Sequence, residues 1–221
     1  MKKIIFLITI SLLNTISATP AQNVAVFCSA DDKANNQFKL LAYNLGTLLA
    51  QNNLGLVTGG SRTGLMKEVI DGYASQTNDL SKLFGVLSEA LASYNVHHLT
   101  IPSANLKWSG TIHSRLSDFH GMTDTIIILP GGYGTLHELM DFLVHNQFGL
   151  HKTQIMLVNI NGFWDHLLAL FNHMAQEKLL ALKHLEQIMI VQSPEQCVLK
   201  ILNQESNTPQ HALNTHYWEQ K

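Results

Sequence analysis

The chain has 221 residues, of which 46% are hydrophobic and 14% are charged, so it is long enough to bury one sizeable core. Its formal net charge of −2 and pI near 6.6 give no basic excess, which argues against a nucleic acid polymer as a partner. The only cysteines, Cys28 and Cys197, allow at most one disulfide and show no zinc-type CxxC spacing. We expect Cys28, which lies in an apolar run, to be buried packing.

Residues 1–18 have the pattern of a secretory signal peptide. Lys2 and Lys3 precede an apolar run over 4–16, and Ala18 is a small residue at the expected cleavage position. The run is shorter than the ~20 residues of a membrane-spanning helix. We therefore expect export to the periplasm or medium, with no stable membrane span after cleavage. If the leader stays uncleaved, the protein would be cytoplasmic or membrane-anchored.

Beyond the leader, short apolar runs alternate with longer amphipathic segments. The apolar runs are VAVFC, LGLVT, LFGVL, HHLTI, DTIIIL, IMLVN and IMIV. The amphipathic segments lie over about 36–51, from 64, over 112–120, 135–148 and 162–178, and from 194. This alternation predicts an α/β fold of three layers, a parallel central sheet with helices on both faces. We predict one domain over 22–202 and a polar C-terminal tail over 203–221.

Two of the predicted strand-to-helix junctions are rich in glycine. They read LVTGGSRTGLMKEV, 56–69, and LPGGYGTLHEL, 129–139. Ligands of parallel sheets bind beyond the carboxyl ends of the strands, and bare backbone NH groups before a helix N-terminus suit an anion such as phosphate. The candidate substrate-binding residues are Gly59, Gly60, Ser61, Gly64, Gly131, Gly132, Tyr133, Gly134 and Thr135.

The common nucleotide-binding motifs fit these junctions poorly. Ser61 replaces the middle glycine of a GxGxxG pattern, and no acidic residue closes the next strand to hold a ribose. No GK[ST] follows either loop, which excludes a Walker-type loop. An oxidoreductase that binds a nicotinamide dinucleotide remains one alternative.

The sequence offers little support for a metal site or for a Ser/His/Asp catalytic triad. His137, Asp141 and His145 fall four residues apart and share one helix face, but a single short helix is a poor cage, so we predict no metal site. His97 and His98 flank a predicted strand start and are expected to face solvent. No GxSxG elbow is present for a Ser/His/Asp triad.

Glu138 and Arg115 each allow two interpretations. Glu138 follows Thr135 by three residues, the spacing of a capping box, yet the same carboxylate could point into a pocket. Arg115 lies on a polar helix face, where arginines are usually exposed to solvent. The spacing alone leaves both alternatives open.

Several segments together resemble the Lonely Guy (LOG) family, often mislabelled as lysine decarboxylases. The second loop with Glu138 fits the family hallmark PGGxGTxxE. VAVFCSA resembles the first strand, GGSRTGLM the GGGxxGLM loop, and IHSR the segment usually written MHERK. HNQFGLHKTQIMLVNINGFWDHLLALFNHMAQEKLL resembles the WxQLGIHxKP and GFYxxLL stretches. The resemblance covers nearly all of the predicted domain.

This resemblance implies a Rossmann-like homodimeric enzyme without metal or cofactor. The family hydrolyses the N-glycosidic bond of nucleoside 5'-monophosphates, cytokinin ribotides in particular, to free base and ribose 5-phosphate. By position, its catalytic arginine corresponds to Arg115 and its catalytic glutamate to Glu138, while the backbone of 131–135 would hold the phosphate. A carboxylate suits the oxocarbenium character that builds up on the sugar, and a bound phosphate can orient that sugar.

The chain departs from the family pattern at four positions. Leu116 and Ser114 replace the lysine and the glutamate on either side of the arginine in the family's ERK. Ser61 replaces the third glycine of the first loop, and His137 replaces the acidic residue before the catalytic glutamate. A nucleotide-binding protein of the same fold with little or no turnover is therefore the alternative, in keeping with Leu116.

Overall fold

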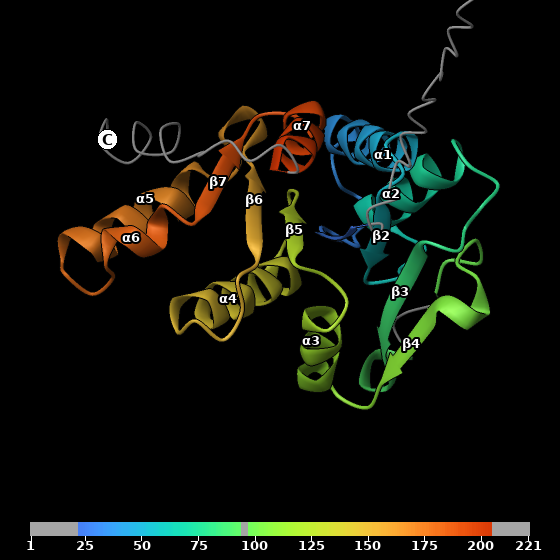
Figure 1. Cartoon of the computed structure of the whole chain (residues 1–221), viewed down its shortest axis with the longest axis horizontal. Helices are drawn as coiled ribbons and strands as arrows, with labels where there is room; N and C mark the ends of the chain where they lie inside the picture. Colours follow the sequence, from blue (N-terminus) through green and yellow to red (C-terminus); the bar gives the residue numbers. More distant parts are fainter. Residues whose placement is uncertain (1–21, 94–96, 205–221) are drawn as a thin grey trace, which may run out of the picture.

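A computed structural model describes residues 22–93 and 97–204 of the chain; the predicted signal peptide and residues 205–221 of the predicted tail lie outside them. Seven parallel strands form a single sheet in the order β4-β3-β2-β1-β5-β6-β7 (Figure 1). The strands are β1 Asn23–Phe27, β2 Gly55–Thr58, β3 Leu83–Ser88, β4 Leu106–Ser109, β5 Thr125–Ile128, β6 Gln154–Val158 and β7 Ile188–Val191. The predicted Rossmann-like α/β fold is confirmed.

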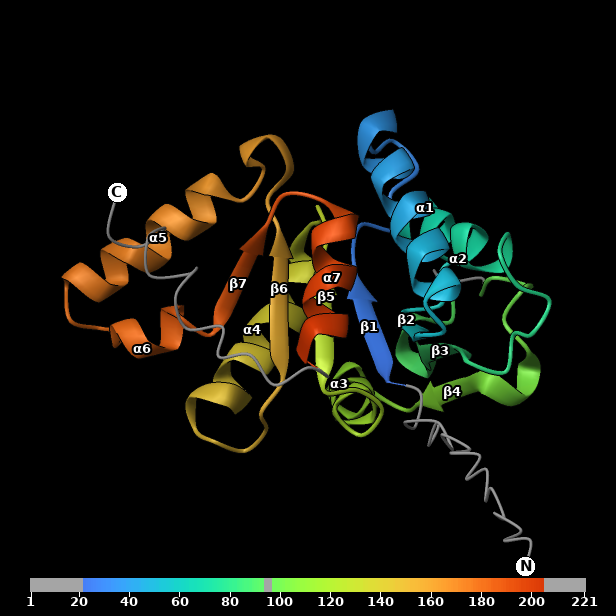
Figure 2. The same cartoon turned by 45° about the horizontal axis from the view of Figure 1, so that its top comes forward.

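Helices cover both faces of this sheet, as Figure 2 shows. The helices are α1 Asn36–Gln51, α2 Gly64–Ala74, α3 Ile112–His120, α4 Tyr133–Gln147, α5 Asp165–Gln176, α6 Leu182–Leu185 and α7 Pro194–Gln204. Side chains of α1, α2 and α7 pack into one buried apolar cluster, and those of α3, α4, α5 and α6 pack into another. The two clusters lie on opposite faces because alternate residues of each strand point to opposite sides, as Val24 and Ala25 do.

The strand order reverses between β1 and β5. From β1 the chain builds outward to β4, then returns through α3 to place β5 on the other side of β1. The loops after β1 and β5 therefore diverge and leave a crevice at the carboxyl ends of these strands, where ligands of such sheets bind.

The prediction for the region between β3 and α3 was wrong. HHLTI is not a strand: it lies in a loop in which only His97 forms an isolated antiparallel bridge, to Ser61. The edge strand β4 instead comes from LKWS, in which Lys107 and Trp108 are exposed. An edge strand with so little burial lacks the apolar pattern on which the sequence interpretation depended.

Glycines set the close approach of α1 to α2. A Cβ at Gly46 would stand 2.0 Å from the backbone oxygen of Val69, and one at Gly72 would stand 2.0 Å from that of Tyr43. Each helix therefore presents a bare backbone to the other, and neither backbone can move without opening the core beneath it.

Gly72→Ala is expected to lower the free energy of unfolding by about 3 kcal/mol, because the added methyl group forces the two helices apart. Urea denaturation followed by circular dichroism measures this. Gly121→Ala is the matched control: Gly121 has a φ of −74°, and its added Cβ would have no neighbour closer than 3.6 Å. Equal midpoints for the two variants would contradict the proposed packing role.

None of the helices in the described ranges is both long and apolar enough to cross a membrane.

Candidate active site

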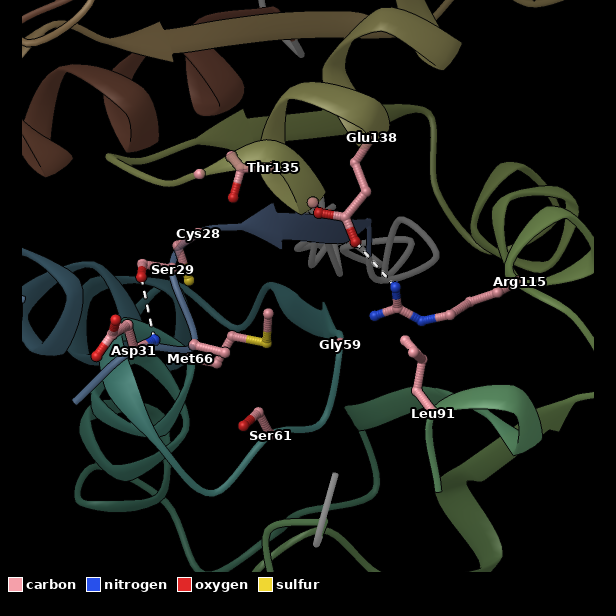
Figure 3. Close-up of a pocket in the computed structure, with 13 residues that line it drawn as sticks. Cys28, Ser29, Asp31, Gly59, Ser61, Met66, Leu91, Arg115, Thr135 and Glu138 are labelled. Atoms are coloured by element: carbon pink, nitrogen blue, oxygen red, sulfur yellow. Dashed lines mark hydrogen bonds and ion pairs between the residues drawn. The ribbon is translucent and has the colours of Figure 1, made fainter. Parts of the chain in front are cut away.

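A pocket of about 330 Å³ lies in the crevice between the loops that follow β1 and β5. Figure 3 shows the side chains that surround it, which come from both halves of the sheet. Its lining residues are Cys28, Ser29, Ala30, Asp31, Gly59, Ser61, Met66, Leu91, Arg115, Gly132, Gly134, Thr135 and Glu138. The pocket thus occupies the position that the fold offers to a ligand.

Arg115 projects from α3 into this pocket and is held on several sides. Its Nε donates a hydrogen bond to the backbone oxygen of Val86 at 2.8 Å, and its Nη1 lies 3.1 Å from Oε1 of Glu138. The guanidinium carbon stands 5.0 Å from the centre of the Phe119 ring. With only 11% of its side chain exposed, Arg115 is positioned by the protein and not by solvent.

Glu138 is the buried carboxylate of the site. It lies on α4, and 5% of its side chain is exposed. Burial raises the pKa of Glu138 from 4.5 to about 7, although the neighbouring Arg115 opposes this rise. A carboxyl group with a pKa near neutrality can accept or release a proton at physiological pH, as a general base or acid must.

The glycines around the pocket have different tasks. A Cβ at Gly59 would lie 2.5 Å from Nη2 of Arg115, so this glycine makes room for the guanidinium. At Gly131 a Cβ would collide with the side chain of Thr135, at 2.1 Å from its Oγ1, so this glycine lets the first turn of α4 fold back. At Gly132 and Gly134 a Cβ would meet nothing within 4 Å. These last two leave the backbone open to a ligand.

The N-terminus of α4 points its free NH groups toward the pocket. The helix begins at Tyr133 with Gly132 as its N-cap, and no side chain caps it. The capping-box interpretation of Thr135 and Glu138 is therefore wrong: both residues lie inside the helix, and Glu138 pairs with Arg115 instead. An uncapped helix start beside a pocket favours an anionic ligand.

The structure brings most of the predicted site residues together. Gly59, Ser61, Arg115, Gly132, Gly134, Thr135 and Glu138 all line the pocket. Four predicted substrate-binding residues do not. Gly60 and Gly64 are buried with φ of 74° and 63°, Gly131 supports Thr135, and the Tyr133 side chain is 93% exposed.

Sequence reasoning missed the loop after β1 as a wall of the pocket. Cys28 is buried as expected, but it also borders the pocket, followed by Ser29, Ala30 and Asp31. Here the backbone NH of Asp31 donates to Oγ of Ser29 at 3.1 Å. This loop borders the pocket because the end of β1 lies next to the end of β5 in the sheet. The pattern of a single sequence does not predict the order of the strands.

Leu116 and Ser114, which differ from the family pattern, both lie away from the pocket. Leu116 is 5% exposed and belongs to the buried core. Ser114 is exposed and forms a capping box with Thr111 at the start of α3. Neither side chain lines the pocket. The two departures from the family pattern therefore affect α3 itself and leave the Arg115–Glu138 pair in place.

One prediction about the histidines needs correction. His98 is buried, and its Nε2 lies 3.1 Å from Oδ1 of Asp71, although it was expected to face solvent. His137, which was considered with Asp141 and His145 as a weak metal trio, is exposed and lies against His113. His120 from α3 joins Asp141 and His145 in its place.

The chain is similar to one protein family and to several of its named members. Residues 65–201 match the sequence model of a family described as "Possible lysine decarboxylase". The chain is 34% identical over 160 residues to "Probable cytokinin riboside 5'-monophosphate phosphoribohydrolase LOG4" of Oryza sativa subsp. japonica, covering 72% of this chain and 66% of that one. It is 29% identical over 192 residues to cytokinin riboside 5'-monophosphate phosphoribohydrolase LOG1 of Arabidopsis thaliana, covering 86% of this chain and 85% of that one.

Solved structures support the same fold. The molybdenum cofactor binding protein from the phototrophic bacterium Rippkaea orientalis superposes with a TM-score of 0.60 at 21% identity, over 85% of this chain and 99% of that one. At this identity the similarity concerns the fold alone.

Proposed function

We propose, from the premise that this chain belongs to the LOG family, that it is a phosphoribohydrolase of nucleoside 5'-monophosphates. The observation that carries the proposal is the buried Arg115–Glu138 pair, which lines the same pocket as the uncapped start of α4. Cytokinin ribotides and AMP are the substrates we expect, since the relatives are named for cytokinin riboside 5'-monophosphates.

The reaction divides between two parts of the pocket. The NH groups at the start of α4, around Gly132 and Gly134, would bind the 5'-phosphate and so orient the ribose. Glu138 would stabilise positive charge on the sugar while a water molecule attacks C1′. The bond between C1′ and the base nitrogen breaks, the water oxygen bonds to C1′, and the base leaves with a proton.

The lysine decarboxylase description fits the pocket poorly. Pyridoxal-dependent decarboxylation uses a lysine that forms a Schiff base with the cofactor. No lysine is among the described residues that line this pocket. The hydrolase chemistry needs only the residues that are present.

Base release from a panel of nucleotides tests the function. We expect the mature protein to free adenine from AMP or the base from isopentenyl-AMP, detected by chromatography, and to act poorly on adenosine, which lacks the phosphate. Calorimetric binding of the same ribotides without any base release would identify the alternative, a binding protein with no turnover. Cleavage of adenosine as fast as of AMP would contradict the phosphate-binding role of α4.

We also propose that the protein is a homodimer and is exported. An apolar groove between α4 and α5, lined by Leu143, Val144 and Leu170 among others, offers a surface for a second copy. Val144 and Leu170 are each 47% exposed, and the exposure of adjacent aliphatic side chains to water is unfavourable. Light scattering measures whether the protein is a dimer in solution. N-terminal sequencing of the native protein tests whether the signal peptide is cleaved after residue 18.

A further inference from the structure

A second polar cluster lies between α3 and α4, beyond the Arg115–Glu138 pair. It comprises His120 of α3, Asp141 and His145 of α4, and His151 of the following loop, none of which lines the pocket. One ligand atom from each of His120, Asp141 and His145 lies within 4.8 Å of the others. Three imidazole rings thus lie together, and two of them contact one carboxylate.

The hydrogen bonds of His145 leave its outer nitrogen free to bind. Its Nδ1 lies 2.8 Å from the backbone oxygen of Asp141. A carbonyl oxygen only accepts, so Nδ1 carries the proton and Nε2 keeps a bare lone pair. Metal-binding histidines show this arrangement, in which a backbone carbonyl fixes the tautomer.

His120 has a buried nitrogen without a partner. The residue is 8% exposed, and its Nε2 lies 2.6 Å from Oδ2 of Asp141. Since a carboxylate accepts, Nε2 donates and Nδ1 is left as a bare acceptor, with no hydrogen-bond partner in the described part of the chain. A buried polar atom of this kind is costly in a native protein unless something binds it.

His151 adds a third ring beside these two. It stacks on His120 with ring centres 4.5 Å apart, and its ring centre lies 5.7 Å from that of His145. His145 keeps 31% of its side chain exposed.

We propose that Nδ1 of His120 and Nε2 of His145, with His151 as a further ligand, bind a divalent transition-metal ion such as Zn²⁺, while Asp141 accepts from Nε2 of His120 and holds its ring in place. Imidazole nitrogens suit zinc and its neighbours, whereas magnesium and calcium prefer oxygen ligands. The ion would join α3 to α4 beside the Arg115–Glu138 pair and holds no part in the hydrolysis. The site does not depend on the proposed function.

The test uses Zn²⁺ and Co²⁺ alone with the full mature chain, untagged and stripped with a chelator. We expect one Zn²⁺ per chain by competition with a chromophoric chelator, and a visible absorption band for tetrahedral Co²⁺. His145→Phe keeps a ring against His120 but removes both nitrogens, so it should weaken Zn²⁺ binding at least tenfold and abolish the band.

His137→Phe is the matched control, because His137 is an exposed histidine of the same helix that lies outside the cluster. Its affinity for Zn²⁺ should equal that of the parent protein. Zn²⁺ should also raise the melting temperature of the parent and of His137→Phe, but not that of His145→Phe. Equal loss in both variants, or Zn²⁺ binding that His145→Phe leaves unchanged, would overturn the proposal.

Discussion

Glu138→Gln is expected to lower base release by about 10³-fold, because the amide can neither accept a proton nor stabilise a cationic sugar as a carboxylate does. The substitution keeps the shape of the side chain and an oxygen that can accept from Arg115, so the pocket should persist. Rates of base release from AMP at saturating concentration measure the effect. Glu177→Gln, at an exposed position after α5, is the control.

The stability of the same variant separates a chemical role from a structural one. The pKa of Glu138 is higher in the folded chain, about 7 against 4.5, so the folded state binds more protons between these values. Stability therefore falls as pH rises from 4.5 to 7, by on the order of 3 kcal/mol if Glu138 acts alone. Glu138→Gln should lose this decline and unfold at pH 8 at no lower urea concentration than the parent. A variant that is inactive because it is unfolded would contradict the assignment.

Arg115→Met is expected to reduce base release at pH 7 by about 10²- to 10³-fold. The arginine opposes the rise in the pKa of Glu138, so its removal raises that pKa further and leaves less carboxylate at neutral pH. Activity needs the ionised form, so the acidic limb of the pH–rate profile, near pH 7 in the parent, should move to higher pH. Profiles of kcat/KM from pH 5 to 9 measure the shift, because this ratio reports ionisation in the free enzyme.

Arg115→Lys provides the comparison for this prediction. Lysine keeps the charge but cannot reproduce the bond from Nε to Val86 together with that from Nη1 to Glu138. We expect its acidic limb to stay close to that of the parent while the rate still falls. If Arg115→Met leaves the limb unmoved, Arg115 does not set the protonation of Glu138.

The sequence predicted the layers of this fold well and its local details less well. Strands buried on both faces, such as β5 and β6, are continuous apolar runs, and they were found. The edge strand β4 was missed because its side chains are half exposed, and the apolar HHLTI was mistaken for it. The hydrophobic pattern of a segment indicates which side chains are buried, and few side chains of an edge strand are buried.

At the site, spacing along the chain could not decide between local and distant partners. Thr135 and Glu138 match a capping box, but the helix starts two residues before Thr135, and Glu138 meets a residue 23 positions away. The polar cluster between α3 and α4 shows the same limit: His137 has helical spacing to Asp141, yet His120 from another helix is the residue that contacts Asp141. Only the pairing of β5 with β1 fixes how α3 stands against α4.

That pairing also dictates when the pocket comes into existence during folding. Gly59, Ser61 and Arg115 precede β5 in the chain, whereas Gly132, Gly134 and Glu138 follow it. Ala25 pairs with Ile126, a contact between residues about a hundred positions apart, and long-range contacts of this kind form slowly. A chain emerging from the ribosome therefore has no site until β5 has been made and docked on β1.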